Sequence, residues 1–326
     1  GVGLLDISGF SRYQVTGPNA RAWLDRLMAS RLPSPGRARL APMLAPSGRL
    51  KGDLTLLNWG DGSWWIMGSY YLRQWHMRWF CDHIEEGVEV RDISDAVVGF
   101  GLAGPRSRDV LTSLTHQDLS HQALGFLGCT TLDIGLIRAK VVRLSVCGEL
   151  GYEINCSAAE HITLRETLLE AGRQCDIRET GFYAMNSLRL EKSFGVWSAE
   201  FTQDRTPGMT GMDRWIDFSK PDFIGRTAAL EEHEKADPPQ RLVTLEIDAD
   251  DADSSSYEPV WAGDTRVGFT TSGGYGHYTG KSLAMALVDS AVSNDTDLAV
   301  HVVGRQQGAR ILSEPAWDPA GDRMRT

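Results

Sequence analysis

The amino-acid sequence predicts an α+β protein with two similar α+β subdomains and a C-terminal β-barrel or sandwich. Three observations support this fold class. A strand, a Gly-Pro turn and a helix are predicted twice, short β-runs with Gly turns fill the last quarter of the chain, and 42% of the 326 residues are apolar. A chain of this length buries a large core and divides into about two or three compact units.

The repeated unit occurs first in Tyr13–Leu27 and again in Gly99–Leu114. Gly17-Pro18 of the first copy matches Gly104-Pro105 of the second, and an Arg followed by apolar residues comes after each pair. Proline is expected at the start of each helix, where its missing N–H is harmless. Each helix needs a sheet to bury its apolar stripe, so we expect two pseudo-equivalent subdomains facing a shared cleft.

The later elements follow from local patterns. Ala139–Cys156 reads as two β-runs around a Gly-containing turn, which predicts a hairpin. Ser157 and Glu160 predict a capping box for a helix that Gly172 ends. The acidic segment Asp248–Pro259 reads as a solvated loop among the β-runs that begin near Arg241. We therefore predict a core over residues 1–235 and a barrel domain over residues 240–326.

Charge and cysteine usage narrow the function classes. The net charge of −10 and pI of about 5.3, without a block of Lys or Arg, argue against nucleic acid and anionic lipid as partners. Five irregularly spaced cysteines favour reduced thiols, and no metal-ligand motif is present. No apolar run approaches the ~18 residues of a membrane span. The start at Gly1, without an initiator Met, suggests a piece of a longer protein.

Two local features each allow two interpretations. Gly99, Gly101 and Gly104 form the pattern G-x-G-x-x-G. The third glycine belongs to the repeated Gly-Pro turn, and no acidic residue follows about twenty positions later. A turn is therefore favoured over a dinucleotide site.

Asp53 follows Gly52, at the point where a turn is expected to lead into a strand. Because a carboxylate at the mouth of a half-buried strand must be solvated, hydrogen-bonded or functional, a turn residue and a functional residue are both open.

Several motifs occur in order along the whole chain. They are GVGLLDISGFSRYQVTGPNA (Gly1–Ala20), MLAPSGRLKGDLTL (Met43–Leu56), CGELGYEI (Cys147–Ile154), SLRLE (Ser187–Glu191), FIGR (Phe223–Arg226) and TSGGYGHYTGKSLAMALV (Thr271–Val288). Together they resemble the T-protein of the glycine cleavage system, an aminomethyltransferase. AMNSLRLEKSFGVW, TSGGYGH and EPAWDP are most similar to the folate domains fused to flavin modules in dimethylglycine and sarcosine dehydrogenases, and a similar domain ends trimethylamine N-oxide demethylases.

The resemblance implies a central folate cleft between the two subdomains and tetrahydrofolate as cofactor. The implied reaction captures a formaldehyde- or iminium-level unit from an N-methylated amine, such as dimethylglycine or sarcosine, as 5,10-methylene-tetrahydrofolate. Methyl transfer giving 5-methyl-tetrahydrofolate and a non-catalytic folate-binding module are the alternatives. The implied partners are a methylated amine or formaldehyde donor and a flavin dehydrogenase or oxidase module, with no nucleic acid and no membrane. The implied location is the cytoplasm, or the mitochondrial matrix in a eukaryote.

Two acidic residues match functional positions of the family. Glu153, the last acid of GELGYE, corresponds to the carboxylate that accepts the 2-amino group and the neighbouring ring N–H of the pterin. Asp53 corresponds to the catalytic carboxylate beside folate N5 and N10, which orients the reacting group, stabilises positive charge or accepts a proton. From the residues alone, an exposed strand glutamate is the alternative for Glu153.

Three further residues are candidates for cofactor binding. Trp317 of EPAWDP matches an aromatic that lines the family's ligand site, with ordinary packing as the alternative. Tyr70, after the strand WWIMGS, is a candidate for the pterin pocket. Met185 replaces the Arg that meets the folate's glutamate tail in the T-protein, so Arg189 is the candidate cation there, with a structural partner of buried carboxylates as its alternative. Val146 stands where many flavin-fused relatives have a Tyr.

Overall fold

The computed structural model describes residues 1–236 and 238–325, which form two compact units. The first unit contains residues 1–41, 54–182 and the segment from Gly321 on, and the second contains residues 42–53 and 183–320. Two mixed sheet-and-helix regions and a closed barrel confirm the predicted α+β class. Residues 183–235 group with the barrel in these units, and the predicted domain boundary near residue 240 stays a prediction.

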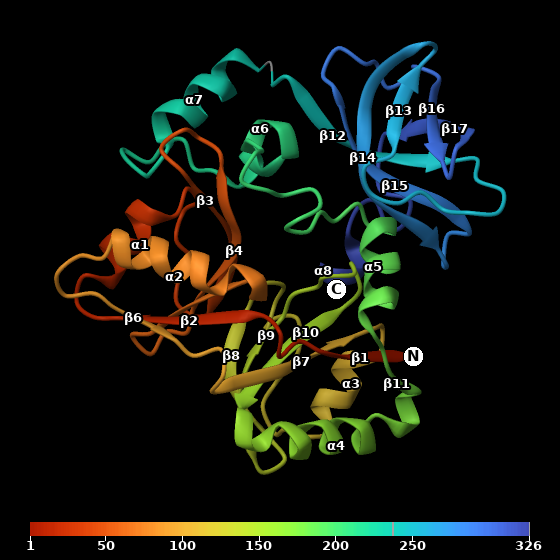
Figure 1. Ribbon diagram of the computed structural model, residues 1–326. Helices are drawn as coiled ribbons and strands as arrows, with labels where there is room; N and C mark the ends of the chain where they lie inside the picture. The colour runs from red at the N-terminus through yellow and green to blue at the C-terminus, as the bar shows by residue number, and fades with distance from the viewer. Residues whose placement is uncertain (237, 326) are drawn as a thin grey trace. The chain divides into compact units, whose positions relative to one another are not determined.

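A six-stranded sheet of the first unit has the strand order β11-β1-β7-β10-β9-β8 (Figure 1). Its strands are β1 (Val2–Asp6), β7 (Val97–Ala103), β8 (Cys129–Ile134), β9 (Ile137–Val142), β10 (Gly151–Ser157) and β11 (Ile177–Glu179). All neighbouring strands are antiparallel except β1 and β11, which are parallel. The predicted hairpin is confirmed, because β9 and β10 pair Val142 with Glu153.

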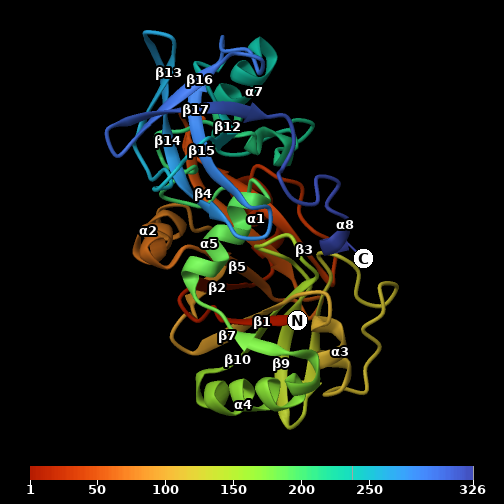
Figure 2. The same cartoon turned by 90° about the vertical axis from the view of Figure 1, so that its right-hand side faces the viewer.

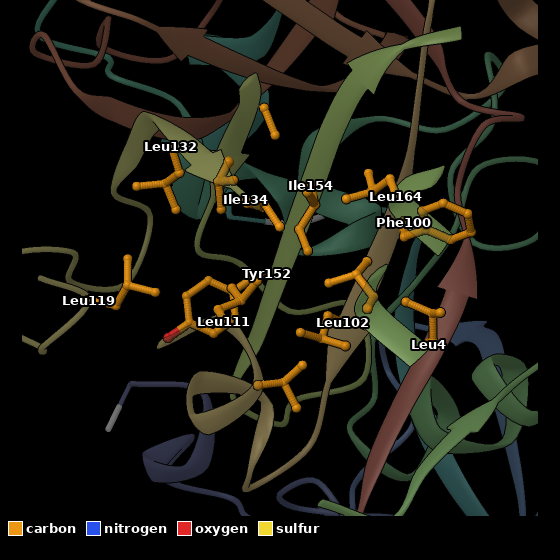
Figure 3. Close-up of a cluster of buried hydrophobic side chains, with 14 of the residues drawn as sticks. Leu4, Phe100, Leu102, Leu111, Leu119, Leu132, Ile134, Tyr152, Ile154 and Leu164 are labelled. Carbon is orange, nitrogen blue, oxygen red and sulfur yellow. The ribbon is translucent and has the colours of Figure 1, made fainter. Parts of the chain in front are cut away.

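One face of this sheet buries a hydrophobic core. Helices α3 (Ser107–Thr112) and α4 (His161–Ala171) cover that face, and both contact β10. Figure 3 shows Tyr152 and Ile154 of β10 within the core, together with Leu102 and Leu164. Because successive side chains of a strand point to opposite faces, the residues that alternate with Tyr152 and Ile154 lie on the other face of the sheet.

A second sheet has the strand order β3-β4-β5-β2-β6. Its strands are β2 (Ser11–Thr16), β3 (Arg37–Leu44), β4 (Leu50–Asn58), β5 (Trp64–Gly68) and β6 (Glu89–Asp92), accompanied by α1 (Ala20–Leu27), the 3-10 turn η1 (Tyr70–Leu72) and α2 (Arg73–Asp82). Helix α1 buries Trp23, Leu24 and Leu27, the apolar stripe that the repeat predicts.

The predicted repeat is present as β2–α1 and β7–α3. The glycine of each Gly-Pro pair has a positive φ, +111° at Gly17 and +136° at Gly104. A Cβ at these positions would lie 2.2 Å from the Gly87 carbonyl oxygen and 2.5 Å from the Gly1 carbonyl oxygen, so each turn requires glycine. The prediction that proline starts each helix is wrong, because an N-cap residue separates the proline from the helix.

The G-x-G-x-x-G segment lies mostly within β7, which is antiparallel to both β1 and β10. A dinucleotide-binding turn instead follows a strand of a parallel βαβ unit. Gly99 has a packing role here, since a Cβ on it would lie 2.3 Å from the Ile154 carbonyl oxygen. The antiparallel pairing therefore supports the turn interpretation of this glycine pattern.

The second unit contains short helices and a closed six-stranded barrel (Figure 2). The helices are α5 (Phe182–Glu191), α6 (Pro207–Thr210), the 3-10 turn η4 (Met212–Trp215) and α7 (Arg226–Lys235). The barrel strands are β12 (Gln240–Ile247), β13 (Pro259–Ala262), β14 (Thr265–Gly276), β15 (Lys281–Asp289), β16 (Leu298–Val302) and β17 (Arg305–Leu312). Pairing of β12 with β17 closes the barrel. The sequence did not predict β13, because its four residues directly follow the acidic loop.

Two predicted element starts are wrong. Strand β4 begins at Leu50, so Asp53 is its fourth residue and Gly52 lies within the strand. Helix α4 begins only at His161, because Ser157 caps a preceding 3-10 turn, η2 (Ala158–Glu160). A further turn, η3 (Arg173–Cys175), follows α4, and α8 (Asp322–Arg325) ends the described chain. Across residues 1–236 and 238–325, no helix is long and apolar enough to cross a membrane.

Candidate functional site

Glu153 lies in the middle of β10, on the face opposite the hydrophobic core. Its neighbours Tyr152 and Ile154 belong to the core (Figure 3), so Glu153 and Asn155 point to the other side of the sheet. That side is covered as well, since Glu153 is only 8% exposed and Asn155 only 1%. The alternative of an exposed strand glutamate is therefore wrong.

The Glu153 carboxylate has no hydrogen bond or ion pair with any residue that the structure describes. Burial raises the pKa of Glu153 to about 7, and the positive charge of Arg12 opposes this rise. A buried carboxylate without hydrogen-bond donors costs free energy in the protein alone. The site can therefore accept hydrogen bonds from a ligand with adjacent N–H donors.

Gly101 has no side chain and is the strand neighbour of this carboxylate. Gly101 of β7 pairs with Glu153 on one side and with Leu5 of β1 on the other, so the three positions form a row across one face of the sheet. A Cβ on Gly101 would lie 3.5 Å from Ile7 Cγ2, which is ordinary contact, so packing does not require glycine here. The row thus combines the Glu153 carboxylate, a glycine without a side chain and the half-buried, apolar Leu5. In the sequence, Gly101 is recognisable only as part of a turn or dinucleotide motif.

Arg12 of β2 is a second buried charge that the sequence analysis missed. Its exposure is 0%, and its Nε donates a 2.8 Å hydrogen bond to Asn155 Oδ1. Its terminal nitrogens donate to the carbonyl oxygens of Phe10 at 2.9 Å and Ile7 at 3.0 Å. All of these partners are uncharged. Burial lowers the pKa of Arg12, and the charge of Glu153 is the strongest influence opposing that change. No local pattern could reveal this role, because an Arg in a predicted strand normally points to solvent.

Asp53 lies on the half-buried face of β4, in alternation with the buried Gly52 and Leu54. It has no ion pair within the part of the chain that the structure describes. Its side chain keeps some solvent contact, yet desolvation by the surrounding protein raises its pKa to about 7, opposed by a hydrogen bond from its own backbone. A carboxyl group that titrates near neutral pH can accept and return a proton. The turn interpretation of Asp53 is wrong, because the residue lies inside a strand.

Trp317 follows the barrel and is half-buried. Its backbone N–H donates to the Glu191 carbonyl oxygen at 3.0 Å, and its ring packs edge-on against Tyr278 with centroids 6.1 Å apart. Lys192, only 3% exposed, has Nζ 5.6 Å from the indole centroid and 3.2 Å from Asp318 Oδ2. These contacts hold the indole in one position within the second unit, and a ligand contact by Trp317 stays a prediction.

Arg189 is 2% exposed and forms an ion pair of 3.1 Å with the fully buried Glu200. It also donates to Asn186 Oδ1 at 2.8 and 3.0 Å and to the Phe194 carbonyl oxygen at 3.1 Å. This environment supports the structural alternative for Arg189, because its donors are already engaged inside the second unit. We place no ligand contact on this residue.

The other candidates have less specific surroundings. Tyr70 is 58% exposed in η1, and its role in a pterin pocket stays a prediction. Val146 lies in the loop between β9 and β10, and Met185 lies in α5. Of the predicted site residues, Glu153 and Tyr70 belong to the first unit, whereas Asp53, Arg189 and Trp317 belong to the second. Within the two described ranges, no group of three metal-binding side chains occurs.

Comparison with known proteins identifies the family. The chain matches the family described as GCVT N-terminal domain over residues 1–220 and the glycine cleavage T-protein C-terminal barrel domain over residues 240–318. It is 34% identical to mitochondrial dimethylglycine dehydrogenase of Mus musculus over 330 residues, which is 99% of this chain and 38% of that protein. It is 28% identical to an aminomethyltransferase of Anoxybacillus flavithermus over 319 residues, covering 97% of this chain and 87% of that protein.

The fold agrees with this assignment. The crystal structure of glycine cleavage system aminomethyltransferase T from Bartonella henselae superposes with a TM-score of 0.87 at 23% identity, covering 98% of this chain and 87% of that one. The chain spans 38% of the mouse dehydrogenase and most of the length of the aminomethyltransferases. The chain therefore belongs to the glycine cleavage T-protein family, a family of tetrahydrofolate-binding aminomethyltransferases.

Proposed function

We propose that this chain transfers one-carbon units to tetrahydrofolate, capturing a formaldehyde- or iminium-level unit from an N-methylated amine as 5,10-methylene-tetrahydrofolate. The observation that carries the proposal is the Glu153 carboxylate, which is buried and unpaired among the described residues and pairs across the sheet with Gly101, a residue without a side chain. A reduced pterin is flat and presents a 2-amino group next to a ring N–H, so it matches both features.

Glu153 binds and orients the pterin in this proposal. A carboxylate can accept two parallel N–H bonds from one planar group, which sets the orientation as well as the affinity. The missing side chain at Gly101 lets the planar ring lie against the sheet beside Leu5. Because Glu153 has no donor from the described protein residues, its full acceptor capacity is available to the ligand.

In this proposal Asp53 is the general base, which accepts the proton released from the folate nitrogen. When bound, tetrahydrofolate supplies N5 and N10 as nucleophiles toward the carbon of the donor. Each new carbon–nitrogen bond displaces a proton from nitrogen, so a nearby base promotes the reaction. The pKa of Asp53, about 7, is suited to accepting that proton at neutral pH and passing it to the departing amine. Trp317, held by Lys192, Glu191 and Tyr278, would provide an aromatic surface for the ligand.

The proposed donors are secondary and tertiary N-methyl amines such as dimethylglycine or sarcosine. The 34% identity to a dimethylglycine dehydrogenase over nearly the whole chain supports this class of donor. The same similarity supports a flavin dehydrogenase or oxidase module as the partner that generates the oxidised one-carbon unit. The proposed location is the cytoplasm, or the mitochondrial matrix in a eukaryote. The negative net charge of −10 agrees with a small-molecule donor rather than nucleic acid.

Product identification tests the proposal. The full chain is incubated with tetrahydrofolate and either formaldehyde or dimethylglycine plus an oxidising flavoenzyme, and the folate products are separated by mass spectrometry. We expect 5,10-methylene-tetrahydrofolate to form faster than in the protein-free reaction. A 5-methyl product would instead support direct methyl transfer, and folate binding without acceleration would identify a non-catalytic folate-binding module.

Substitutions at Gly101 test whether the ligand lies against this glycine beside Glu153. We expect Gly101→Val to fold, because valine suits a strand and the first added carbon meets only ordinary contacts. Its affinity for tetrahydrofolate should fall at least tenfold, about 1.4 kcal/mol, because the side chain occupies the space beside Glu153. Calorimetric titration measures the effect, with Gly101→Ala as a smaller step and exposed Gly9→Ala as control. Equal affinity in all variants would show that the ligand lies elsewhere.

A further inference from the structure

Two buried charges of the first unit lie near each other without forming a salt bridge. Arg12 and Glu153 are 0% and 8% exposed, and neither forms an ion pair with any residue in the described ranges. Their side chains share a neighbour, because Arg12 Nε donates to Asn155, which follows Glu153 by two positions on the same face of β10. An isolated buried charge costs free energy, and the charge of each of these two residues favours the ionised form of the other.

We propose that Arg12 is a positioning residue of the ligand site, which keeps Glu153 ionised from a distance and leaves both carboxylate oxygens free for the ligand. This inference rests on the proposed function of Glu153 as the pterin-binding carboxylate. This role explains why a cation is buried at Arg12, which takes no other part in the proposed reaction.

The hydrogen bonds of Arg12 explain why the two charges do not pair directly. The guanidinium is tied to the carbonyl oxygens of Ile7 and Phe10 in the β1–β2 turn and to the side chain of Asn155. A direct bidentate pair with Glu153 would occupy the acceptors that the ligand needs. Held by neutral partners, Arg12 contributes a through-space attraction, which is strong in a region of low dielectric constant.

Few other ionisable groups surround Glu153. On β7, the positions that pair with Glu153 and Asn155 are glycines. On β9, Val142 pairs with Glu153 and Lys140 pairs with Asn155, but Lys140 already forms a 3.0 Å ion pair with Asp61. The charge of Arg12 is accordingly the main favourable charge acting on Glu153.

Asp6 and the Cys156 thiol, whose pKa burial raises to about 11, are the other two groups that influence Arg12. Asp6, before the β1–β2 turn, has a weaker influence than Glu153 and lies 3.3 Å from the His161 imidazole. Cys156 has the weakest influence and belongs to the hydrophobic core on the opposite face of β10. Neither forms a salt bridge with Arg12, so no direct ion pair offsets the electrostatic attraction between the guanidinium and Glu153.

A purely structural Arg12 would pin the β1–β2 turn to β10 and would affect stability alone. The two roles differ in their pH dependence. Ligand binding to an ionised Glu153 weakens as pH falls through the pKa of that carboxyl, about 7. Loss of the positive charge favours protonation, so the midpoint of this pH dependence must rise when Arg12 is neutralised and stay unchanged when the charge is kept.

The experiment measures the affinity of the full chain for 5-formyl-tetrahydrofolate by calorimetry across the pH range from about 5 to about 9, which brackets the titration of Glu153. For Arg12→Met we expect the midpoint to rise by about one pH unit and the affinity at neutral pH to fall about tenfold. Arg12→Lys should keep the wild-type midpoint. In a Glu153→Gln background, which has no carboxyl to titrate at this position, Arg12→Met should not change the pH dependence or the remaining affinity further. The inference would be overturned if both Arg12 variants lost the same affinity at every pH and kept the wild-type midpoint.

Asn155→Asp provides a second test if Arg12→Met fails to fold. The new carboxylate keeps the hydrogen bond to Arg12 but neutralises its charge, so the midpoint should again rise. A ¹³C NMR titration of the Glu153 carboxyl measures the same shift without ligand, and this readout separates the inference from the proposed function. A shift in the NMR midpoint without any folate binding would refute the proposed function only, whereas an unchanged NMR midpoint in Asn155→Asp and Arg12→Met would refute the role of Arg12.

Discussion

Replacing Glu153 by alanine is expected to abolish measurable binding of tetrahydrofolate, with an affinity loss of at least ~100-fold, about 3 kcal/mol. The reason is the loss of both acceptor atoms for the adjacent N–H groups of the pterin. Calorimetric titration of the full chain measures the loss, and Asp53→Ala serves as the matched control because it removes a carboxylate of the second unit. Retained binding in Glu153→Ala would refute the assignment of Glu153 as the pterin anchor.

The same site should respond to Glu153→Gln with a gain in stability. Burial raises the pKa of Glu153 in the folded protein above its unfolded value, so the folded state holds the proton more tightly. Stability therefore falls as pH rises from about 4.5 to about 7, and it stays reduced above that range. The uncharged variant lacks this penalty, and we expect its free energy of unfolding at pH ~8 to exceed that of the wild type by ~1–3 kcal/mol. A destabilised Glu153→Gln would show that Glu153 has a structural role.

Replacing Asp53 by asparagine is expected to lower kcat of one-carbon transfer by ~10²–10⁴-fold while changing the affinity for tetrahydrofolate only a few-fold. Asparagine keeps the size and polarity of the side chain but cannot accept the proton displaced from nitrogen. Steady-state kinetics with formaldehyde as donor, combined with calorimetry, separates the two effects. A loss of affinity as large as the loss of kcat would instead indicate that Asp53 binds the ligand.

The pH profile adds an independent check on Asp53. The pKa of Asp53 and that of Glu153 are both raised to about 7, and both residues act in their ionised forms. In the wild type kcat/KM should fall below pH 7 more steeply than tenfold per pH unit, because two groups become protonated together. In Asp53→Asn only the titration of Glu153 remains, so the fall should be no steeper than tenfold per unit. Identical slopes would exclude Asp53 as the base.

Local sequence patterns predicted much of the fold. The repeated Gly-Pro turns, the β9–β10 hairpin and the end of α4 at Ala171 are present. These features depend on residues close together in the chain, such as a glycine with positive φ at Gly17. The misses have the same origin. β13 is only four residues long, and the early start of β4 at Leu50 is concealed by two glycines that read as bends.

By itself, the sequence determined the α+β class, the barrel and the family, because motifs and residue periodicity are local properties of the chain. The sequence also predicted Glu153 and Asp53 as site residues, and their roles stay predictions. Only the tertiary structure decided that Arg12 and Gly101 accompany Glu153, since strand pairing and side-chain contacts bring together residues far apart in sequence. It also decided that Arg189 pairs with Glu200 inside the second unit. Burial and charge compensation depend on what surrounds a side chain. The sequence therefore does not distinguish a solvent-exposed strand Arg from one that is buried near a carboxylate.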